Sequence, residues 1–385
     1  MTGYSHFAIV GLLAAALFIT APATGETPAG AGLVPPAPAA PPAPRPAPEP
    51  VRRAETAFSP ALVYGDRVLS EDTTWRGEVL IEGVVAVAPQ ATLTVEPGTV
   101  VRFRRKGVQA PLLVVQGRIV AAGTRETPVL FTSNFAAPAP GDWQGILLLG
   151  SEKNNLLENC RIEGAESGIE ALFSSVTLKG VRAEHAGTGM KFQDALVTMD
   201  AGGFSDCDTA LHFSDSEATL RNLSLTGNRL GLTALRSSIY LFEANLSGNQ
   251  GAAFSGDACR VKIQGGAVLG NGSGVTLIGC QGSLTGARLA KNREYGLSLK
   301  ESRVRVTGNV ISGNGNNGVI AADGGAVAWD NAIFENAGYD LYNAGGEEFR
   351  APGNWWGGMA PKIFDNGGRG RVLYAPVLGA RPQPR

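Results

Sequence analysis

The chain has few of the side chains that metal and redox chemistry use. Its 385 residues include only three histidines, four methionines and four cysteines, and no two cysteines form a CxxC pair. Zinc and copper sites need such side chains at short, regular spacings. We therefore expect no metal site and no cofactor, which argues against a role in copper delivery.

The chain also has little net charge and no apolar run long enough to cross a bilayer comfortably. With a net charge of −1 and 17% charged residues, no overall field favours nucleic acid. The apolar run from Phe7 to Thr20 is short and suits the core of a signal peptide, with small residues near Ala23 as a cleavage zone. No Lys or Arg precedes this run, so a short membrane anchor is the alternative.

These features predict export, with residues 1–25 as a signal peptide and a periplasmic, cell-surface or extracellular location. No transmembrane span is expected in the mature chain. Residues 26–58 are rich in Pro and Ala and are predicted to be a disordered, extended linker. Such a linker either lifts the folded part away from an envelope surface or is an inert tail.

The middle of the chain is a repeat. Asparagines recur at intervals of 21 or 22 residues, each preceded by an apolar residue three positions earlier: Asn228, Asn249, Asn271, Asn292, Asn314 and Asn336. After each asparagine come two further short segments in which apolar side chains alternate, separated by Gly, Asn, Ser and Asp. Each unit therefore predicts three short strands joined by turns.

Strands this short bury their apolar faces only when successive units stack. Three strands in a coil of about 20–23 residues predict an all-β parallel β-helix solenoid, whose residue columns advance by about 4.8 Å per coil. Stacked asparagines inside a turn can pass amide hydrogen bonds from coil to coil. We interpret the asparagine column as a structural ladder.

The repeat resembles the right-handed parallel β-helix proteins of the pectin-lyase-like superfamily, from about Trp75 to Pro376. The resemblance implies an N-terminal cap and first coils over residues 59–150, repeats over 151–350, a C-terminal cap over 351–378 and a tail over 379–385. The adjacent Trp355 and Trp356 fall in the cap. Burial over the last coil is the expected role, and a platform for sugars is the alternative.

Motifs of the polysaccharide-degrading members are missing. No two aspartates adjoin, no Gly-His-Asp run occurs, and the one Arg-x-Lys, Arg104 to Lys106, lies in the entry coils. The basic run around Arg104 is expected to be a solvated turn. The predicted set of catalytic residues is therefore empty, although groups distant in sequence can converge in space.

Two of the cysteines fall in one column. Cys259 and Cys280 are separated by one coil and share their column with Ser216, Ser237 and Ser302. Adjacent coils bring their Cα atoms within the range of a disulfide, although parallel side chains make the geometry marginal. A disulfide and a stacked pair of reduced thiols both remain open. Cys160 and Cys207 lie in different columns and are expected to stay free.

One outward column is a candidate binding site. The residue between the two inward positions of one strand in each coil should point to solvent, and that column reads Glu170, Lys191, His212, Thr233, Ala253, Thr276, Ser298 and Ile320. Its first three members place an acid, a base and an imidazole roughly 5 Å apart. Asp194 and Asp215 follow at the strand ends, in one column with Arg236. The alternative is an ordinary solvated face with a weak Glu170–Lys191 pair.

Two functions from different classes follow. The first is a non-enzymatic exported scaffold whose long face binds a polysaccharide or another cell-envelope component. The second is a carbohydrate-active enzyme, a lyase, hydrolase or epimerase, whose active site has no recognisable motif. Carboxylates converging in a groove favour the enzyme, and a flat face of mixed polarity favours the scaffold. The missing motifs favour the scaffold.

Overall fold

The computed structural model describes residues 53–382. The predicted signal peptide and residues 26–52 of the predicted linker lie outside the described residues. Within residues 53–382 the chain is all β, apart from one short 3₁₀ helix, η1 (Asn366–Gly368). This part of the chain contains no helix of the length and apolarity that a membrane crossing requires.

The strands form where inward and outward side chains alternate, and they end at corner residues whose backbone is in the left-handed conformation. In β24 (Ser238–Phe242), Ile239 and Leu241 point into the core while the residues beside them remain partly exposed. Arg236 and Glu243, on either side of this strand, have φ values of 46° and 48°. This conformation turns the chain sharply, and glycine or a short polar residue adopts it most readily. The many glycines of the repeat follow from this demand.

The strands form three parallel sheets, and each coil contributes one strand to each sheet. The first sheet consists of β1 (Leu62–Tyr64), β4 (Glu78–Ile81), β7 (Val100–Phe103), β10 (Val129–Ser133), β13 (Cys160–Glu163), β16 (Arg182–Glu184), β19 (Gly203–Ser205), β22 (Ser224–Thr226), β25 (Asn245–Ser247), β28 (Ala267–Leu269), β31 (Arg288–Ala290), β34 (Val310–Ser312) and β37 (Ala332–Phe334).

The second sheet carries the candidate column. It consists of β2 (Arg67–Leu69), β5 (Val84–Val87), β8 (Leu112–Val115), β11 (Trp143–Leu149), β14 (Ala165–Leu172), β17 (Thr188–Gln193), β20 (Thr209–Ser214), β23 (Leu230–Leu235), β26 (Ala252–Asp257), β29 (Ser273–Ile278), β32 (Leu297–Lys300), β35 (Val319–Ala322), β38 (Leu341–Asn343) and β40 (Ile363–Phe364).

The third sheet closes each coil. It consists of β3 (Thr73–Trp75), β6 (Thr92–Val95), β9 (Arg118–Ala122), β12 (Asn155–Glu158), β15 (Ser175–Lys179), β18 (Leu196–Asp200), β21 (Glu217–Arg221), β24, β27 (Arg260–Gln264), β30 (Gln281–Thr285), β33 (Arg303–Thr307), β36 (Val327–Trp329), β39 (Phe349–Arg350) and β41 (Val372–Leu373).

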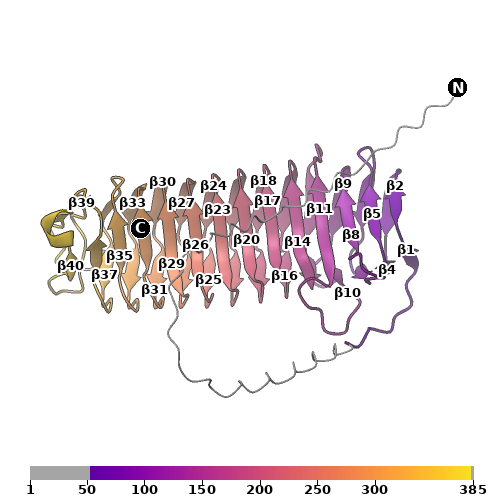
Figure 1. Ribbon diagram of the computed structural model, residues 1–385, viewed down its shortest axis with the longest axis horizontal. Helices are drawn as coiled ribbons and strands as arrows, with labels where there is room; N and C mark the ends of the chain where they lie inside the picture. The colour runs from indigo at the N-terminus through magenta and orange to yellow at the C-terminus, as the bar shows by residue number, and fades with distance from the viewer. Residues whose placement is uncertain (1–52, 383–385) are drawn as a thin grey trace, which may run out of the picture. The chain divides into compact units, whose positions relative to one another are not determined.

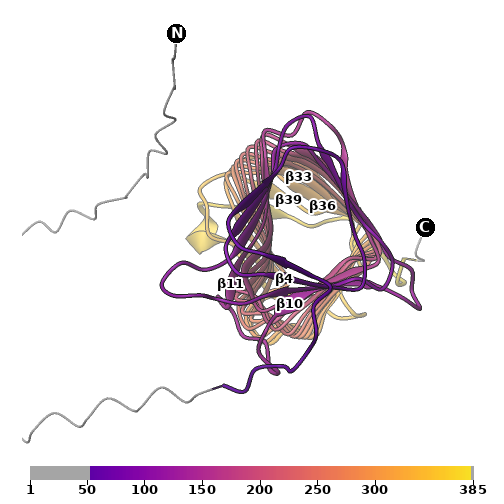
Figure 2. The same ribbon diagram turned by 90° about the vertical axis from the view of Figure 1, so that its right-hand side faces the viewer.

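These sheets confirm the predicted parallel β-helix. Figure 1 shows the strands stacked along the long axis of the solenoid, and Figure 2 looks along that axis at the three sheets around the core. The core contains the inward side chains of every coil, such as Phe192 and Phe213, whose rings stack 4.9 Å apart. No strand could bury its apolar face alone, so the stacking of coils creates the core.

The register corrects one coil of the sequence analysis. Leu232 lies opposite Phe254 and Thr233 opposite Ser255, so Ser255 takes the outward position and Ala253 is fully buried. The prediction that Ala253 points outward is therefore wrong. The corner 248–251 lengthens this coil, and a count from the preceding asparagine cannot show on which side of the strand the added residue falls.

The asparagine ladder is confirmed in its geometry. The amide of Asn271 donates to the carbonyl of Leu246 at 2.9 Å and to Oδ1 of Asn292 at 3.0 Å. Its own Oδ1 accepts from the backbone and the amide of Asn249, at 3.0 and 2.8 Å. All four hydrogen-bonding positions of the buried amide are used. The ladder therefore pairs buried backbone groups and side-chain amides of each coil with those of the next.

The structure contains further ladders. Asn309, Asn331 and Asn354 repeat the same pattern at the corner between the third and first sheets. Near the corner between the second and third sheets, backbone amides donate to the side chains of the next coil along a serine and cysteine column: Ser174, Ser216, Ser237, Cys259, Cys280 and Ser302. Each corner of the coil therefore has its own internal hydrogen bonding.

Two additional contacts shape the N-terminal coils. Glu55, from the end of the predicted linker, forms an antiparallel bridge with Phe135, and Arg53 forms an ion pair with Asp142. Both partners belong to the long connection between β10 and β11.

In the basic run, Arg104 and Lys106 form ion pairs with Glu82. The Arg104 guanidinium, and to a lesser extent Lys106, lowers the pKa of Glu82.

Replacement of Asn271 by Ala should lower the free energy of unfolding by about 3 kcal/mol, because it leaves several buried donors and acceptors of neighbouring coils unpaired. Chemical denaturation measures the change. Asn316→Ala is the control, since Asn316 lies exposed at a corner, and it should shift the midpoint little. Equal effects of the two substitutions would contradict a stabilising role for the ladder.

Candidate functional site

The outward column of the second sheet forms a continuous array on successive coils. The strand registers align Glu170, Lys191, His212, Thr233, Ser255, Thr276, Ser298, Ile320, Tyr342 and Phe364. We call these residues the outer column. Along the solenoid its chemistry changes from ionic, through hydroxyl, to aromatic. Neighbouring members are separated by one strand spacing, about 4.8 Å.

The ionic end of the outer column lies in a shallow depression. Glu170, Lys191 and His212 line it together with Glu166, Ser167, Thr188 and Thr209, around a volume of about 460 Å³. The Lys191 ammonium contacts a Glu170 carboxylate oxygen at 2.8 Å. Both side chains are partly exposed, so the pair stabilises the fold by less than about 1 kcal/mol. Its groups therefore remain available to a ligand.

His212 is the most constrained of the three side chains. Its Nδ1 lies 2.8 Å from the hydroxyl of Thr233, and its Nε2 lies 3.2 Å from the hydroxyl of Ser214. Both hydroxyls can donate or accept, so they suit either tautomer of the ring. Burial, and secondarily the charge of Lys191, lowers the pKa of His212. The ring is therefore neutral at pH 7 and held in a fixed orientation.

The hydroxyl groups of the depression were not predicted from the alternation of apolar residues. Ser167, Thr188 and Thr209 lie in one register column, three residues before the outer column. A strict alternation of inward and outward residues does not predict them, because two consecutive residues point inward between this column and the outer column. Gly168 and Ile169 do so in β14. A Cβ on Gly168 would lie 2.4 Å from the carbonyl oxygen of Gly189. The close contact explains the small residues that break the alternation.

Asp194 and Asp215 lie apart from the depression. Both are left-handed corner residues, with φ values of 49° and 51°, just beyond the ends of β17 and β20. Asp215 accepts two hydrogen bonds from the Arg236 guanidinium, at 2.7 and 2.6 Å. These bonds lower the pKa of Asp215 and raise that of Arg236. The structure thus brings Asp215 to Arg236 rather than to His212.

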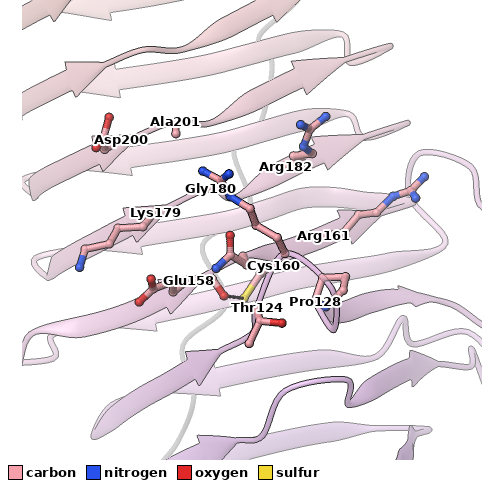
Figure 3. Close-up of a pocket in the computed structure, with 12 residues that line it drawn as sticks. Thr124, Pro128, Glu158, Cys160, Arg161, Lys179, Gly180, Arg182, Asp200 and Ala201 are labelled. Carbon is pink, nitrogen blue, oxygen red and sulfur yellow. Dashed lines mark hydrogen bonds between the residues drawn. The ribbon is translucent and has the colours of Figure 1, made fainter.

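A larger cavity, of about 620 Å³, lies at the corner between the third and first sheets. Figure 3 shows Arg161 and Arg182 on one side of it, and Glu158, Lys179 and Asp200 on the other. The latter three alternate in charge within one register column. Arg161 pairs with Glu163 and Glu184. The cavity is therefore lined by charges of both signs, and Arg161 is held by carboxylates that lie outside its lining.

The four cysteines are buried and form no disulfide in the structure. Cys259 accepts from the backbone of Ser237 at 3.4 Å, and Cys280 accepts from the backbone of Cys259 at 3.3 Å. Each thiol also lies against the carbonyl two residues earlier, at 3.1 and 3.3 Å. The hydrogen bond to Cys259, together with burial, raises the pKa of Cys280. Burial raises the pKa of Cys160 to about 12 and that of Cys207 to about 11.

Two family models match the chain. A pectate-lyase-like β-helix domain matches residues 67–201, and the periplasmic copper-binding protein family NosD matches residues 192–360. The name of the NosD family places its members in the periplasm, which agrees with the predicted export of this chain. A search among curated proteins found no match.

Some solved structures are similar to this chain at low identity and with TM-scores below 0.4. A variant of a periplasmic alginate epimerase is 12% identical over 80% of this chain and 78% of its own, with a TM-score of 0.38. The A-module of a mannuronan C-5 epimerase from Azotobacter vinelandii is 15% identical over 80% and 91%, with a TM-score of 0.39. An alginate lyase from a Paenibacillus species is 14% identical over 75% and 93%, with a TM-score of 0.32. The likeness concerns the fold alone.

His212 should make the protein acid-sensitive in a defined window. Its pKa is lowered in the folded state, so below about pH 6.5 the unfolded chain binds a proton that the folded chain resists. Stability is then lost as the pH falls from about 6.5 through the folded pKa. In His212→Gln the melting temperature should fall less over this window, whereas the exposed His185→Gln should match the parent. Parallel curves for His212→Gln and the parent would contradict the assignment.

Thiol titration distinguishes the two states open to Cys259 and Cys280. Both sulfurs already accept and donate hydrogen bonds within the serine and cysteine column. We therefore expect four free thiols in protein unfolded without reductant, equal to the number in a reduced sample. Two free thiols in the unreduced sample would instead indicate a disulfide.

Proposed function

We propose that the chain, a parallel β-helix with regions similar to a pectate-lyase-like β-helix domain and to the NosD family, is a non-enzymatic, exported scaffold that binds a carbohydrate polymer of the cell envelope. The proposed ligand lies along the outer column of the second sheet. Glu170, Lys191 and His212 hold one end of it, and hydroxyl side chains of later coils hold the rest.

The observation that carries this proposal is the regular spacing of hydrogen-bonding groups in the outer column. From Glu170 to Ser298 each coil presents a charged, imidazole or hydroxyl side chain. Such an array suits an extended ligand with many hydroxyl groups, because each strand spacing adds a donor, an acceptor or both. A compact ligand would use only two or three of these positions.

The depression at the ionic end adds charge to the array. Lys191 can donate to a carboxylate or a hydroxyl, while Glu170 and Glu166 accept from hydroxyls. The neutral imidazole of His212 supplies a fixed polar edge beside them. Hydrogen bonds to charged groups contribute more than neutral ones, so this end should provide most of the affinity. Asp194 and Asp215 would contact only a ligand that extends over the corner.

Binding is favoured over catalysis by the shape of the face. The strands from β13 to β29 are joined by short corners, of which the segment 248–251 is the longest. Within these coils no long loop rises beside the depression to exclude water, as acid–base chemistry in a closed site requires, and the long connection between β10 and β11 comes near it at Glu166. The Glu170 carboxylate is also engaged by Lys191. A polysaccharide lyase, hydrolase or epimerase is the alternative function.

Copper binding, which the name of the NosD family states, does not fit the side chains of residues 53–382. Residues 53–382 bring no three His, Cys, Asp or Glu side chains together. The four thiols are buried and lie against main-chain carbonyls. A copper site needs such donors to converge around one point. We therefore assign no step to a metal.

Lys191→Ala and His212→Ala should each weaken binding of the recognised glycan by roughly tenfold to a hundredfold, since each removes a hydrogen bond of about 1.5–3 kcal/mol made with or beside a charge. A glycan array identifies the ligand, and calorimetry on the purified protein measures the affinity. Circular dichroism should show an unchanged fold, because both side chains point outward.

Lys262→Ala is the matched control, because Lys262 is exposed on β27 of the third sheet. It should bind as the parent does. Equal affinity of the parent and both outer-column variants would exclude this binding face. Shortening of the bound polymer, or inversion of its sugar configuration, would instead identify the protein as an enzyme.

A further inference from the structure

An aromatic pocket lies where the C-terminal cap replaces a corner of the last coil. Its volume is about 360 Å³, and it is lined by Phe334, Glu335, Asp340, Trp355, Trp356, Gly357, Met359, Ala360 and Lys362. Ligand pockets in proteins have volumes of roughly 300–1,000 Å³. This pocket therefore has room for a small ligand. None of its residues belongs to the depression around Glu170.

The pocket has a buried donor without a partner. Trp356 is 4% exposed and belongs to the core, yet its indole Nε1 finds no hydrogen-bond partner among the described residues. Buried indole N–H groups in native proteins are nearly always paired, and an unpaired one is destabilising. The cap would not need a tryptophan here for covering alone, since Phe or Leu would fill the space without an unpaired donor. The donor points to a ligand.

Trp355 supplies a flat apolar surface held in place by the backbone. Its backbone N–H donates to the backbone carbonyl of Asn331 at 2.9 Å, and its backbone carbonyl accepts from the backbone N–H of Ile333 at 2.8 Å. Its ring meets that of Phe334 edge to face, with centroids 5.2 Å apart. The Arg381 guanidinium lies over the Phe334 ring, which makes Phe334 a side wall. Trp355 is only half-buried, so it can serve as the stacking surface.

The polar rim is more acidic than basic. Asp340 is tied to the amide of Asn336 and the backbone N–H of Lys362, both at 3.1 Å. The Lys362 ammonium donates to the carbonyls of Asn336 and Ala337. Glu335 stands exposed at the corner. Two carboxylates and one ammonium already engaged by carbonyls disfavour an anionic ligand, while Glu335 can accept hydrogen bonds from hydroxyl groups.

We propose that this pocket on the C-terminal cap is a second binding site that takes one uncharged sugar ring. The apolar face of the ring packs on Trp355, the Trp356 indole donates to a ring or hydroxyl oxygen, and Glu335 accepts from a hydroxyl. Met359, which is 80% exposed, moves to admit the ring to the buried indole. The flexible thioether side chain suits such a movement.

The site extends the proposed carbohydrate binding to a second place on the chain, but it depends on none of the same residues. Two measurable sites follow, one for a polymer along the outer column and one for a single uncharged ring at the cap. Lys191→Ala and His212→Ala impair only the first. The failure of one site can therefore be distinguished from the failure of the other.

The test titrates the full chain, with ¹⁵N-labelled tryptophan, with methyl β-D-glucopyranoside, N-acetylglucosamine and galacturonic acid. The indole N–H signal of Trp356, assigned by its loss in Trp356→Phe, should shift and saturate with at least one uncharged sugar at millimolar concentration. Galacturonic acid should shift it at least tenfold less at the same concentration. In Lys191→Ala and His212→Ala the titration should be unchanged.

Variants of the pocket complete the test. Trp355→Ala should weaken binding of the uncharged sugar at least tenfold, and Glu335→Gln, which leaves the aromatic wall intact, should weaken it severalfold. Trp329→Phe, on β36 of the third sheet, is the matched control and should bind as the parent does. A Trp356 signal that moves with none of the three sugars overturns the proposal, as does equal binding by Glu335→Gln and the parent.

Discussion

The stacking of one coil on the next, with every interior polar group paired along the axis, is the constraint on which this structure depends. Parallel strands of two to eight residues bury enough apolar surface only in a stack, and their corners bring backbone amides and carbonyls into the core. The ladder through Asn271 pairs these groups with the coils on both sides. Because unpaired polar groups in a core are destabilising, a shift by one residue would be unfavourable. The ladders therefore help to set the register of all three sheets.

That register determines what the outside of the molecule can do. Once the coils are aligned, residues one coil apart in sequence become neighbours, and the outer column becomes a row of side chains at a spacing set by the sheet. The inward positions must remain apolar, but the outward positions are free to differ from coil to coil. The row therefore runs from Glu170, Lys191 and His212, through hydroxyls, to Tyr342 and Phe364. A row of this kind suits binding along its length.

The C-terminal end of the solenoid is packed differently from its middle. In the middle, each coil covers the next, and charges of both signs line the cavity at a corner, as around Arg161 and Asp200. At the C-terminal end the cap must cover a coil without repeating it, and Trp356 does so from the inward side. The mismatch between cap and coil leaves a pocket that no repeat could form, because a further coil would fill it. Unusual chemistry is therefore concentrated where the periodicity ends.

Much of this could be predicted from the sequence. The asparagine spacing, the alternation of apolar residues and the glycine-rich turns report on local geometry, so they identified the parallel β-helix, the ladder from Asn228 to Asn336, and the outward direction of Glu170, Lys191 and His212. The shared column of Cys259 and Cys280 followed from the same period. Each of these features depends only on which residues recur at which interval.

Other features depended on the tertiary structure. Ser255, and not Ala253, takes the outward position because this coil has a longer corner. Only the strand pairing shows where in the coil the added residue lies. Ser167, Thr188 and Thr209 entered the depression because two consecutive residues turn inward, a break that alternation cannot anticipate. The pairing of Asp215 with Arg236 and the unpaired indole of Trp356 arise from side-chain directions at corners and caps. The sequence by itself determined the period and thus the fold, because the same spacing of apolar residues, asparagines and turns recurs in every coil. Only the tertiary structure decided which polar groups meet, because their contacts depend on the places where this spacing is interrupted.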